Sequence, residues 1–414
     1  MEDHLKEFDI DLTHMVYGGE AMGRLPDGRA VFVPYAIAGE KVRLRLVEEK
    51  RGYARAELLE VLEPSPGRIP PRCERPAACG GCHYQHIAYP MQLQIKTEIL
   101  REQLERIGGL SDIPIQPIVP SPKMWNYRNH IQLHISPEGK LGFLEPRSNT
   151  VVPIEDCPLA EEPLDEIWRK LDIESIPGLE RVGLRLGADE DILLVLAGSA
   201  PGAPEFSVED LDISAVYTGP NGTMVLAGSD YLVMEISDRK YKVSAESFFQ
   251  VNTLQAGAMV EHLLGNLLLD PGKDVLELYS GVGLFSAFIS GKVKRLAAVE
   301  SSPSAVNDFV ENLDEFDNVE IYETQVEQVM AGLDIRPNVL LADPPRAGLG
   351  HRVVESIVSL GAPAFAYISC DPATLARDAK DLAKGGYTLE KITPFDLFPQ
   401  TYHIESISFW RMGS

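Results

Sequence analysis

The stretch KDVLELYSGVGLFS (residues 273–286) decides the fold of the C-terminal part of the chain. It joins a short apolar strand to a G-x-G turn at Gly281 and Gly283 and then to the start of a helix. Glycines in such a turn allow a cofactor to approach the backbone closely. The third glycine of the usual fingerprint is replaced by Ser286. The turn alone therefore predicts a nucleotide-bearing cofactor without saying which one.

Two acidic residues near this turn bear on the choice of cofactor. Glu300 ends the next strand, RLAAVE, where its carboxylate could accept hydrogen bonds from a ribose diol. Glu277 lies inside the first strand and fits S-adenosylmethionine at least as well as a dinucleotide, because without a diphosphate the third glycine matters less. A nicotinamide-dependent dehydrogenase is the rival interpretation at this point.

Short apolar strands continue from Lys273 onward and alternate with helical patterns, which predicts a parallel sheet with crossover helices. Asp343, in DPPRAGL, and Cys370 each follow such a strand, and Glu405 comes just before the last one. Ligands bind at the carboxyl ends of parallel strands, so we expect these three side chains to converge. A loop that caps the sheet and a buried structural cysteine are the alternatives.

The sequence before this region has a different organisation. Residues 8–62 contain five short alternating stretches separated by glycine turns, which predicts a small β-barrel of the oligonucleotide-binding type. Four prolines in residues 63–71 indicate a linker. Residues 89–108 have a helical period, with Leu93, Leu100, Leu104 and Ile107 on one face. Residues 113–236 are expected to be mainly β.

The five cysteines suggest two separate roles. The chain begins MEDHLKEFDIDL, which is charged and does not resemble a secretory signal peptide, so a reducing compartment is expected and a disulfide framework is not. Cys73, Cys79 and Cys82 are spaced C-x5-C-x2-C, and Cys157 is the obvious fourth ligand. Four thiolates suit a [4Fe–4S] cluster, and tetrahedral zinc would accept them too. Spacing alone does not choose between the two metals.

Composition and charge limit the class of protein. The chain has 414 residues, 44% of them hydrophobic and 24% charged, which is ordinary for two or three globular domains. No apolar run reaches the ~18 residues that a membrane span needs, and we expect a cytoplasmic protein. The net charge of −24 would argue against a nucleic-acid partner.

The distribution of charge changes that argument. Residues 1–150 hold 19 basic and 20 acidic groups, whereas residues 151–230 hold 4 and 17. Residues 41–55 (KVRLRLVEEKRGYAR) contain six basic groups and two acidic ones. This run indicates either a solvated strand face, the more common case, or a local patch that contacts phosphates. We expect any affinity for RNA to be local in origin and steeply dependent on salt.

Six ordered motifs resemble one known family, the S-adenosylmethionine-dependent RNA 5-methyluridine methyltransferases that carry an iron–sulfur cluster. The motifs are SFFQVN (247–252), LELYSGVG, AVE, DPPRAG, YISCDPATLARD and FPQTYHIE. The N-terminal module looks like a TRAM domain, an RNA-binding barrel that ends in the P-x-C of PPRC. The resemblance covers nearly the whole chain. It implies an α/β fold with a Rossmann-like methyltransferase domain, an OB-like TRAM barrel and a mainly β central iron–sulfur domain.

The resemblance also assigns site residues. It implies that S-adenosylmethionine is held by Gln250, Tyr279, Glu300 and Asp343, and that the cluster is ligated by Cys73, Cys79, Cys82 and Cys157. Leu284 and Gln325 stand where many members of the family have asparagine, so these two contacts depart from the pattern, although we retain Gln325 among the cofactor-binding candidates.

The chemistry implied by the resemblance agrees with the residue types. Carbon 5 of uracil is a poor nucleophile until a thiolate adds at carbon 6, and Cys370 matches that nucleophile. Glu405 matches the base that accepts the carbon 5 proton, and Asp343 would orient the pyrimidine or the cofactor amine, with Arg346 close by. The target base must leave its stack to reach such a site. A cluster with four protein thiolates has no open iron position, so a structural or RNA-shaping role is expected.

The expected domains are residues 1–62 (barrel), 63–240 (central domain, with helix 89–108 available to pack on the catalytic domain) and 241–414 (methyltransferase). The expected substrate is a specific uridine in structured RNA, first 23S ribosomal RNA and second the T-loop uridine of transfer RNA. We expect a monomer with no membrane partner. A non-catalytic RNA-binding protein and a nicotinamide-dependent oxidoreductase are the alternatives from other classes.

Overall fold

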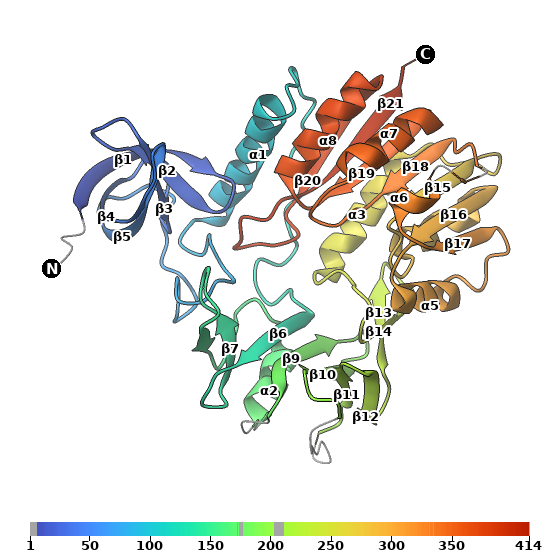
Figure 1. Ribbon diagram of the computed structural model, residues 1–414, viewed down its shortest axis with the longest axis horizontal. Coiled ribbons are helices and arrows are strands. Elements are labelled where there is room, and N and C mark those ends of the chain that lie inside the picture. The colour runs from blue at the N-terminus through green and yellow to red at the C-terminus, as the bar shows by residue number, and fades with distance from the viewer. Residues whose placement is uncertain are drawn as a thin grey trace.

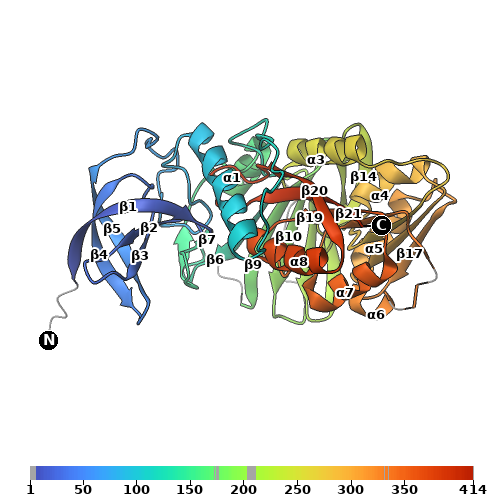
Figure 2. The same cartoon turned by 90° about the horizontal axis from the view of Figure 1, so that it is seen from above.

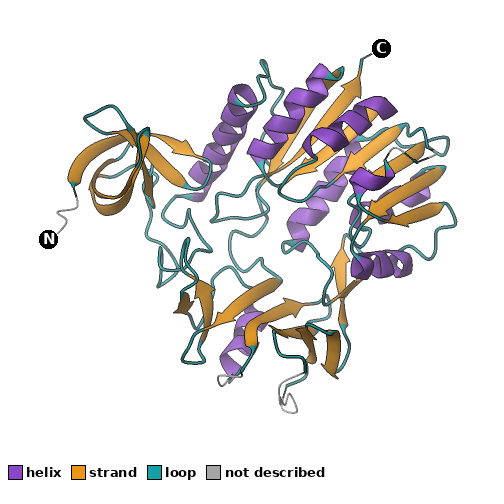
Figure 3. Ribbon diagram, viewed as in Figure 1, coloured by secondary structure: helices purple, strands orange, loops and turns teal. Residues whose placement is uncertain are grey.

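The protein, described here from a computed structural model, consists of an N-terminal barrel, a central mixed sheet and a C-terminal sheet covered by helices (Figures 1 and 3). The structure describes residues 6–413 except 172, 174–176, 203–210, 331 and 334. None of the helices in this described part has the length and apolar character that a membrane span requires.

The barrel confirms the alternation predicted for residues 8–62. Its strands close in the order β1-β2-β3-β5-β4, with the bounds β1 (Glu7–Val16), β2 (Glu20–Arg24), β3 (Ala30–Pro34), β4 (Lys41–Glu49) and β5 (Tyr53–Glu63). Val42, Leu44 and Leu46 point into its core, as strict alternation along a strand requires.

The structure bears on the two interpretations of the basic run at residues 41–55 through the partners of Arg43 and Arg45. Arg43 lies between Asp9 (2.9 Å) and Glu60 (3.0 Å). On the same face of the barrel, Arg45 lies between Glu7 (2.8 Å) and Glu57 (3.0 Å). Because each guanidinium already has two carboxylate partners from neighbouring strands, Arg43 and Arg45 form a solvated, neutralised strand face, the more common of the two cases, and not a phosphate patch.

The central region is mainly β, as predicted, with one helix that the sequence pattern did not reveal. Its seven-stranded sheet has the order β12-β11-β10-β9-β6-β7-β8. The strands are β6 (His130–Ile135), β7 (Leu141–Leu144), β8 (Val151–Pro153), β9 (Leu179–Leu186), β10 (Ile192–Gly198), β11 (Ser214–Gly219) and β12 (Gly222–Ala227). Helix α2 (Glu162–Lys170) covers this sheet through Leu164 and Trp168. A separate hairpin, β13 (Tyr231–Ile236) with β14 (Arg239–Ser244), leads into the C-terminal region.

The C-terminal sheet has seven strands in the order β17-β16-β15-β18-β19-β21-β20. β15 to β19 run parallel, and β21 is antiparallel to both of its neighbours. The strands are β15 (Asp274–Leu278), β16 (Arg295–Glu300), β17 (Val319–Glu323), β18 (Val339–Ala342), β19 (Ala364–Ser369), β20 (Tyr387–Phe395) and β21 (Glu405–Met412). This arrangement confirms the parallel sheet predicted from strand and helix alternation.

Both faces of this sheet are buried, which explains its nearly continuous apolar strands. Along β18, Val339 and Leu341 pack into one core while Leu340 and Ala342 pack into the other. The first core includes α3 (Thr253–Asn266), α4 (Leu284–Ile289) and α5 (Pro303–Asn312). The second includes α6 (Val326–Val329), α7 (Gly350–Leu360) and α8 (Pro372–Lys384). A short 3₁₀ turn, Ser290–Lys292, follows α4.

Helix α1 (Tyr89–Arg106) is the first helix of the chain, yet it packs beside α8, on the C-terminal sheet (Figures 1 and 2). Leu100 and Leu104 are fully buried in the second core, as the helical period predicted. Leu93 and Ile107, assigned to the same face, are only half-buried, and Ile95 and Ile99 are buried against the barrel core instead. α1 therefore connects the barrel to the C-terminal sheet through two apolar faces.

Candidate active site and cysteine-lined cavity

The residues predicted to carry the chemistry meet at the carboxyl edge of the C-terminal sheet. Asp343 directly follows β18, and Cys370 directly follows β19. Glu405 is the first residue of β21, which runs antiparallel to β19, so that its amino end reaches the same edge. Glu405 is buried, whereas Asp343 and Cys370 are half-buried. The topology thus brings two carboxyl groups and one thiol together from three separate strands.

The glycine turn after β15 has the backbone that its sequence requires. Tyr279, Gly281 and Gly283 have φ values of 62°, 54° and 90°, in the left-handed region. A Cβ atom at Gly283 would lie 2.4 Å from the Leu313 side chain, so only glycine fits there. Glu300 stabilises the turn, because its carboxylate accepts a hydrogen bond from the Gly281 amide at 2.9 Å.

The other residues expected to contact S-adenosylmethionine lie in separate places around this turn. Gln250 follows β14 and is half-buried, and its carbonyl oxygen accepts a hydrogen bond from the Asn129 side chain at 3.1 Å. Gln325 is exposed, next to α6, and its side-chain oxygen accepts from Gln328. Leu284 is buried in the apolar core of the sheet. The leucine at that position therefore contributes packing where an asparagine would offer polar atoms.

Burial dominates the electrostatics of the acidic groups at this edge. It raises the pKa of Glu277 to about 8 and that of Asp343 to about 7. The pKa of Glu405 is raised to about 8 by burial and by the charge of Asp343, while the Arg346 and Lys96 cations oppose that shift. Three carboxyl groups with raised pKa values near one strand edge are typical of a site that handles protons.

The thiol of Cys370 has the same environment. Its pKa is raised to about 12, first by burial and then by the carboxylates of Glu405 and Asp343, while Arg346 lowers it. The thiol is therefore protonated at neutral pH when no substrate is bound. A positive charge placed at this edge would stabilise the thiolate, which is the reactive form.

Arg346 has a measurable role in this scheme, because its guanidinium lowers the pKa of both Glu405 and Cys370. We expect Arg346→Gln to raise both pKa values and to move the rising limb of the pH–rate profile to higher pH. Activity at pH 7 should then fall by up to about tenfold, since one pKa unit changes the reactive fraction tenfold. The profile of kcat/KM between pH 6 and 10 tests this. Arg352→Gln, an exposed arginine on α7, is the control, and identical profiles for the two variants would contradict the assignment.

The residues that hold the segment before Glu405 carry no motif in the sequence. Lys96 on α1 is fully buried, where its ammonium forms an ion pair with the fully buried Asp396 and donates to the Phe398 carbonyl at 3.0 Å. Gln92, one turn earlier, exchanges hydrogen bonds with Gln400: its amide donates to the side chain at 2.9 Å, and its oxygen accepts from the backbone at 3.0 Å. α1 therefore fixes the loop that leads to Glu405.

The barrel also contacts the residue that follows Cys370. Tyr17, at the tip of the β1–β2 hairpin, donates a hydrogen bond to Asp371 at 2.8 Å, and Asp371 is the residue after Cys370. The other carboxylate oxygen of Asp371 accepts from the backbone of Ala373 and Thr374, which caps α8. One carboxylate therefore joins the barrel to the helix that positions Cys370.

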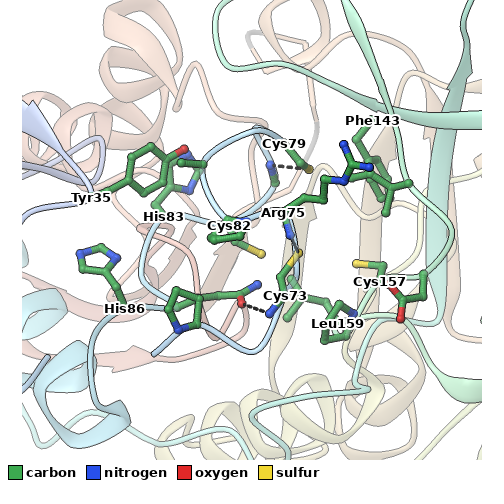
Figure 4. A pocket seen from close by; sticks show the side chains of 18 of the residues that line it. Tyr35, Cys73, Arg75, Cys79, Cys82, His83, His86, Phe143, Cys157 and Leu159 are labelled. Atoms are coloured by element: carbon green, nitrogen blue, oxygen red, sulfur yellow. Dashed lines mark hydrogen bonds between the residues drawn. The ribbon is translucent and has the colours of Figure 1, made fainter. Parts of the chain in front are cut away.

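The four remaining cysteines surround a cavity of about 270 Å³ between the barrel, the linker and the central sheet (Figure 4). Their side chains point into it from residues 73–82 and from the loop at Cys157. The Gly81 amide donates to the Cys79 sulfur at 3.3 Å, and the Arg75 amide donates to that of Cys73 at 3.4 Å. Burial raises the pKa of Cys82 to about 12 and that of Cys157 to about 11. The structure thus places the four cysteines around one cavity.

A neighbouring arginine indicates what the cavity could hold. Arg128 lines it, and its charge lowers the pKa of Cys79 and Cys157. The buried Nε of Arg128 has no hydrogen-bond acceptor among the described residues. In that same part of the chain, no three His, Cys, Asp or Glu side chains converge closely enough to ligate a single ion. The thiols line a volume rather than a point, and a buried donor faces an anionic group that this volume could contain.

Two family models match parts of this chain. Residues 205–411 match the family model described as tRNA (Uracil-5-)-methyltransferase, and residues 6–59 match the TRAM domain. The chain is 32% identical to an uncharacterized RNA methyltransferase of Streptomyces coelicolor, covering 97% of this chain and 92% of that protein. It is 33% identical to one of Aquifex aeolicus, covering 97% and 98%.

One solved structure resembles nearly the whole chain. It is the Pyrococcus abyssi tRNA (uracil-54, C5)-methyltransferase in complex with S-adenosyl-L-homocysteine, with a TM-score of 0.75 and 25% sequence identity. The alignment covers 97% of this chain and 99% of that one. The similarity therefore includes the barrel and the central region as well as the C-terminal sheet.

Proposed function

The chain belongs to the family of RNA (uracil-5-)-methyltransferases, S-adenosylmethionine-dependent enzymes, and on this basis we propose that it methylates carbon 5 of one uridine in a structured RNA through a covalent Cys370–uracil adduct. The observation that carries the proposal is the meeting of Cys370, Glu405 and Asp343 at the strand edge next to the glycine turn. The proposed domains are residues 1–62, 63–240 and 241–414.

The proposed reaction uses the two titratable groups in sequence. The Cys370 thiolate adds to carbon 6 of uracil, which forms an S–C bond and moves the ring electrons into an enolate that is nucleophilic at carbon 5. S-adenosylmethionine, when bound, supplies the methyl group as a sulfonium. Glu405 then accepts the proton from carbon 5, the electron pair of that C–H bond restores the C5–C6 double bond, and the S–C bond breaks to release the thiolate. Burial and the charge of Asp343 raise the pKa of Glu405 to about 8, so the carboxylate form that accepts this proton becomes more populated as the pH rises through that value.

For the cofactor, we propose that Gln250, Tyr279, Glu300 and Asp343 hold S-adenosylmethionine around the glycine turn, with Gln325 at its margin. The backbone of the turn supports this, because Gly281 and Gly283 have left-handed φ values and no side chain that would block a close approach of the cofactor. Asp343 is half-buried and follows β18, which lies between β15, the strand before the turn, and β19, the strand before Cys370. This position suits a residue that orients the pyrimidine or the amine of the cofactor.

For the cysteine-lined cavity, we propose a [4Fe–4S] cluster ligated by Cys73, Cys79, Cys82 and Cys157. The amide donors to two sulfurs and the unpaired Nε of Arg128 support an anionic, sulfur-rich occupant. A cluster spreads its four thiolates over four irons, which suits thiols that line a volume, whereas tetrahedral zinc needs them around one point. The backbone amide of His83, the residue after Cys82, donates a hydrogen bond to the Gln400 carbonyl in the loop before Glu405. A cluster at Cys82 would therefore help to hold that loop, and we assign it a structural role.

We propose 23S ribosomal RNA as the substrate, with transfer RNA as the second candidate because the similar Pyrococcus abyssi enzyme acts on uridine 54 of transfer RNA. In a strain that lacks this gene, we expect one 5-methyluridine to disappear from 23S RNA and to return when the gene is restored. Mass-spectrometric mapping of both RNA classes is the measurement. A loss confined to transfer RNA would select the second candidate, and unchanged 5-methyluridine in both would contradict the proposed function.

A further inference from the structure

A second cavity, of about 440 Å³, is formed by segments that are far apart in the sequence. The barrel contributes the β1–β2 hairpin and β5, the cysteine loop contributes His83, the loop after β7 contributes Arg147, and the loop before Glu405 contributes Tyr402. A site assembled from four distant segments exists only when the domains are docked as they are here.

Two arginines at this cavity are held by one buried carboxylate. Glu20 is only 8% exposed and accepts hydrogen bonds from Arg55 at 2.7 Å and from Arg147 at 2.6 Å. A second carboxylate, Glu48, lies 3.8 Å from Arg55 but is itself paired with Lys50. Among the described residues, the two guanidiniums share this one close carboxylate, which leaves N–H donors without a hydrogen-bond partner, whereas Arg43 and Arg45 on the outer face of the barrel each contact two carboxylates. Such a preorganised pair suits a phosphate group.

The backbone at the cavity is held in an unusual conformation. Arg147 and Tyr35 both have left-handed φ values, 58° and 60°, although neither is glycine. Each such residue costs about 1 kcal/mol or more, and strain of this kind is concentrated at binding sites. The two residues with this backbone conformation, Arg147 and Tyr35, both line the cavity.

The rings of His83 and Tyr402 form part of the cavity wall. The rings of His83 and Tyr402 are 4.5 Å apart, and the edge of Tyr17 meets Tyr402 at 5.4 Å. Tyr17 in turn donates to Asp371, the neighbour of Cys370. Tyr402 of the cavity wall and Tyr17 therefore link the cavity to the residue that follows the nucleophile.

We propose that this cavity binds one unpaired nucleotide of the RNA substrate other than the target uridine, with its phosphate on Arg55 and Arg147 and its base against the aromatic wall. Base stacking on aromatic side chains and phosphate contacts from arginine are the usual means of holding single-stranded RNA. The proposal rests on the proposed function. It adds a second anchor that fixes which uridine enters the active site.

The test compares two arginines of the full-length protein. Arg147→Gln removes a cavity cation whose side chain is 62% exposed, so folding should not depend on it. Arg43→Gln removes a cation on the outer barrel face and is the matched control. With a transcript containing the mapped uridine, we expect Arg147→Gln to raise Kd and KM about tenfold and to reduce the slope of log Kd against log salt by about 1, with the single-turnover rate at saturating RNA unchanged.

Arg43→Gln should change Kd less than about twofold. Equal affinities for the two variants would overturn the proposal, and so would a loss confined to the single-turnover rate. Because Kd is measured by fluorescence anisotropy without methyl transfer, a failed nucleotide site is distinguishable from a failed methyltransferase. In the first case the wild-type enzyme methylates the RNA and Arg147→Gln binds it normally. In the second no methylation occurs, whatever the affinity.

Discussion

Cys370→Ala is expected to abolish methyl transfer to RNA, with a loss of about 10⁴-fold or more, while binding of S-adenosylmethionine is retained. Without the thiol, carbon 5 of uracil stays a poor nucleophile, and no other group at this strand edge can add to carbon 6. The side chain is half-buried at the end of β19, so its truncation should leave the sheet intact. Incorporation of a labelled methyl group measures the activity, and calorimetry measures cofactor binding.

A covalent trap separates this mechanism from a simple loss of fold. RNA containing 5-fluorouridine should form a stable adduct with the wild-type enzyme, since fluorine at carbon 5 cannot be removed as a proton. Glu405→Gln should accumulate adduct on ordinary RNA, because it lacks the proton acceptor but keeps the nucleophile. Cys370→Ala should form none. Appreciable turnover by Cys370→Ala would rule out the covalent mechanism.

Cys82→Ser is expected to remove the cluster and to lower the free energy of unfolding by about 5 kcal/mol or more, because metal binding to a site of this kind is part of the folding energy. Cys82 precedes His83 and Tyr84, whose amides both donate to the Gln400 carbonyl at 2.9 Å. Loss of the cluster should therefore also disturb the loop that leads to Glu405. Iron and acid-labile sulfide per chain, together with a thermal melt, measure both effects.

The prediction for Cys82→Ser has a control variant, and the metal content of the wild-type protein tests the cluster even if that variant does not fold. Cys370→Ala should keep the same iron and sulfide content as the wild type, although it is inactive. The wild-type protein purified without oxygen should contain about four irons and four sulfides per chain. If that preparation contains one zinc per chain, the site is a mononuclear zinc site and not a cluster. If it contains no metal, the proposal of a metal site is wrong.

Local patterns were sufficient to predict the elements and the strand-end residues. Alternation along β4 placed Val42 and Leu44 inside the barrel, and the apolar strands from β15 onward identified a sheet buried on both faces. Once the strands are parallel, Asp343 and Cys370 must lie at one edge. This part of the site follows from the chain near each residue, together with the geometry of a sheet.

The partners of charged residues could not be predicted in this way. No pattern in the sequence indicates that Lys96 is buried against Asp396, 300 positions away in the chain. Arg43 and Arg45 looked available for phosphate, but strand pairing sets carboxylates beside them. Helix α2 escaped notice because it is short and carries few apolar residues within a region rich in strands. The surroundings of these residues depend on which distant segments of the chain lie next to them in the fold.

The position of α1 beside α8 has a consequence for how the protein is made. α8 begins at Pro372, 266 residues after α1 ends at Arg106, so during translation the first helix leaves the ribosome long before its partner exists. Until then Leu100, Leu104 and the buried Lys96 have nothing to pack against, and a chaperone has an exposed segment to bind. A truncated nascent chain therefore cannot assemble a working reaction centre. Completion of the last strands is the step that releases a competent enzyme.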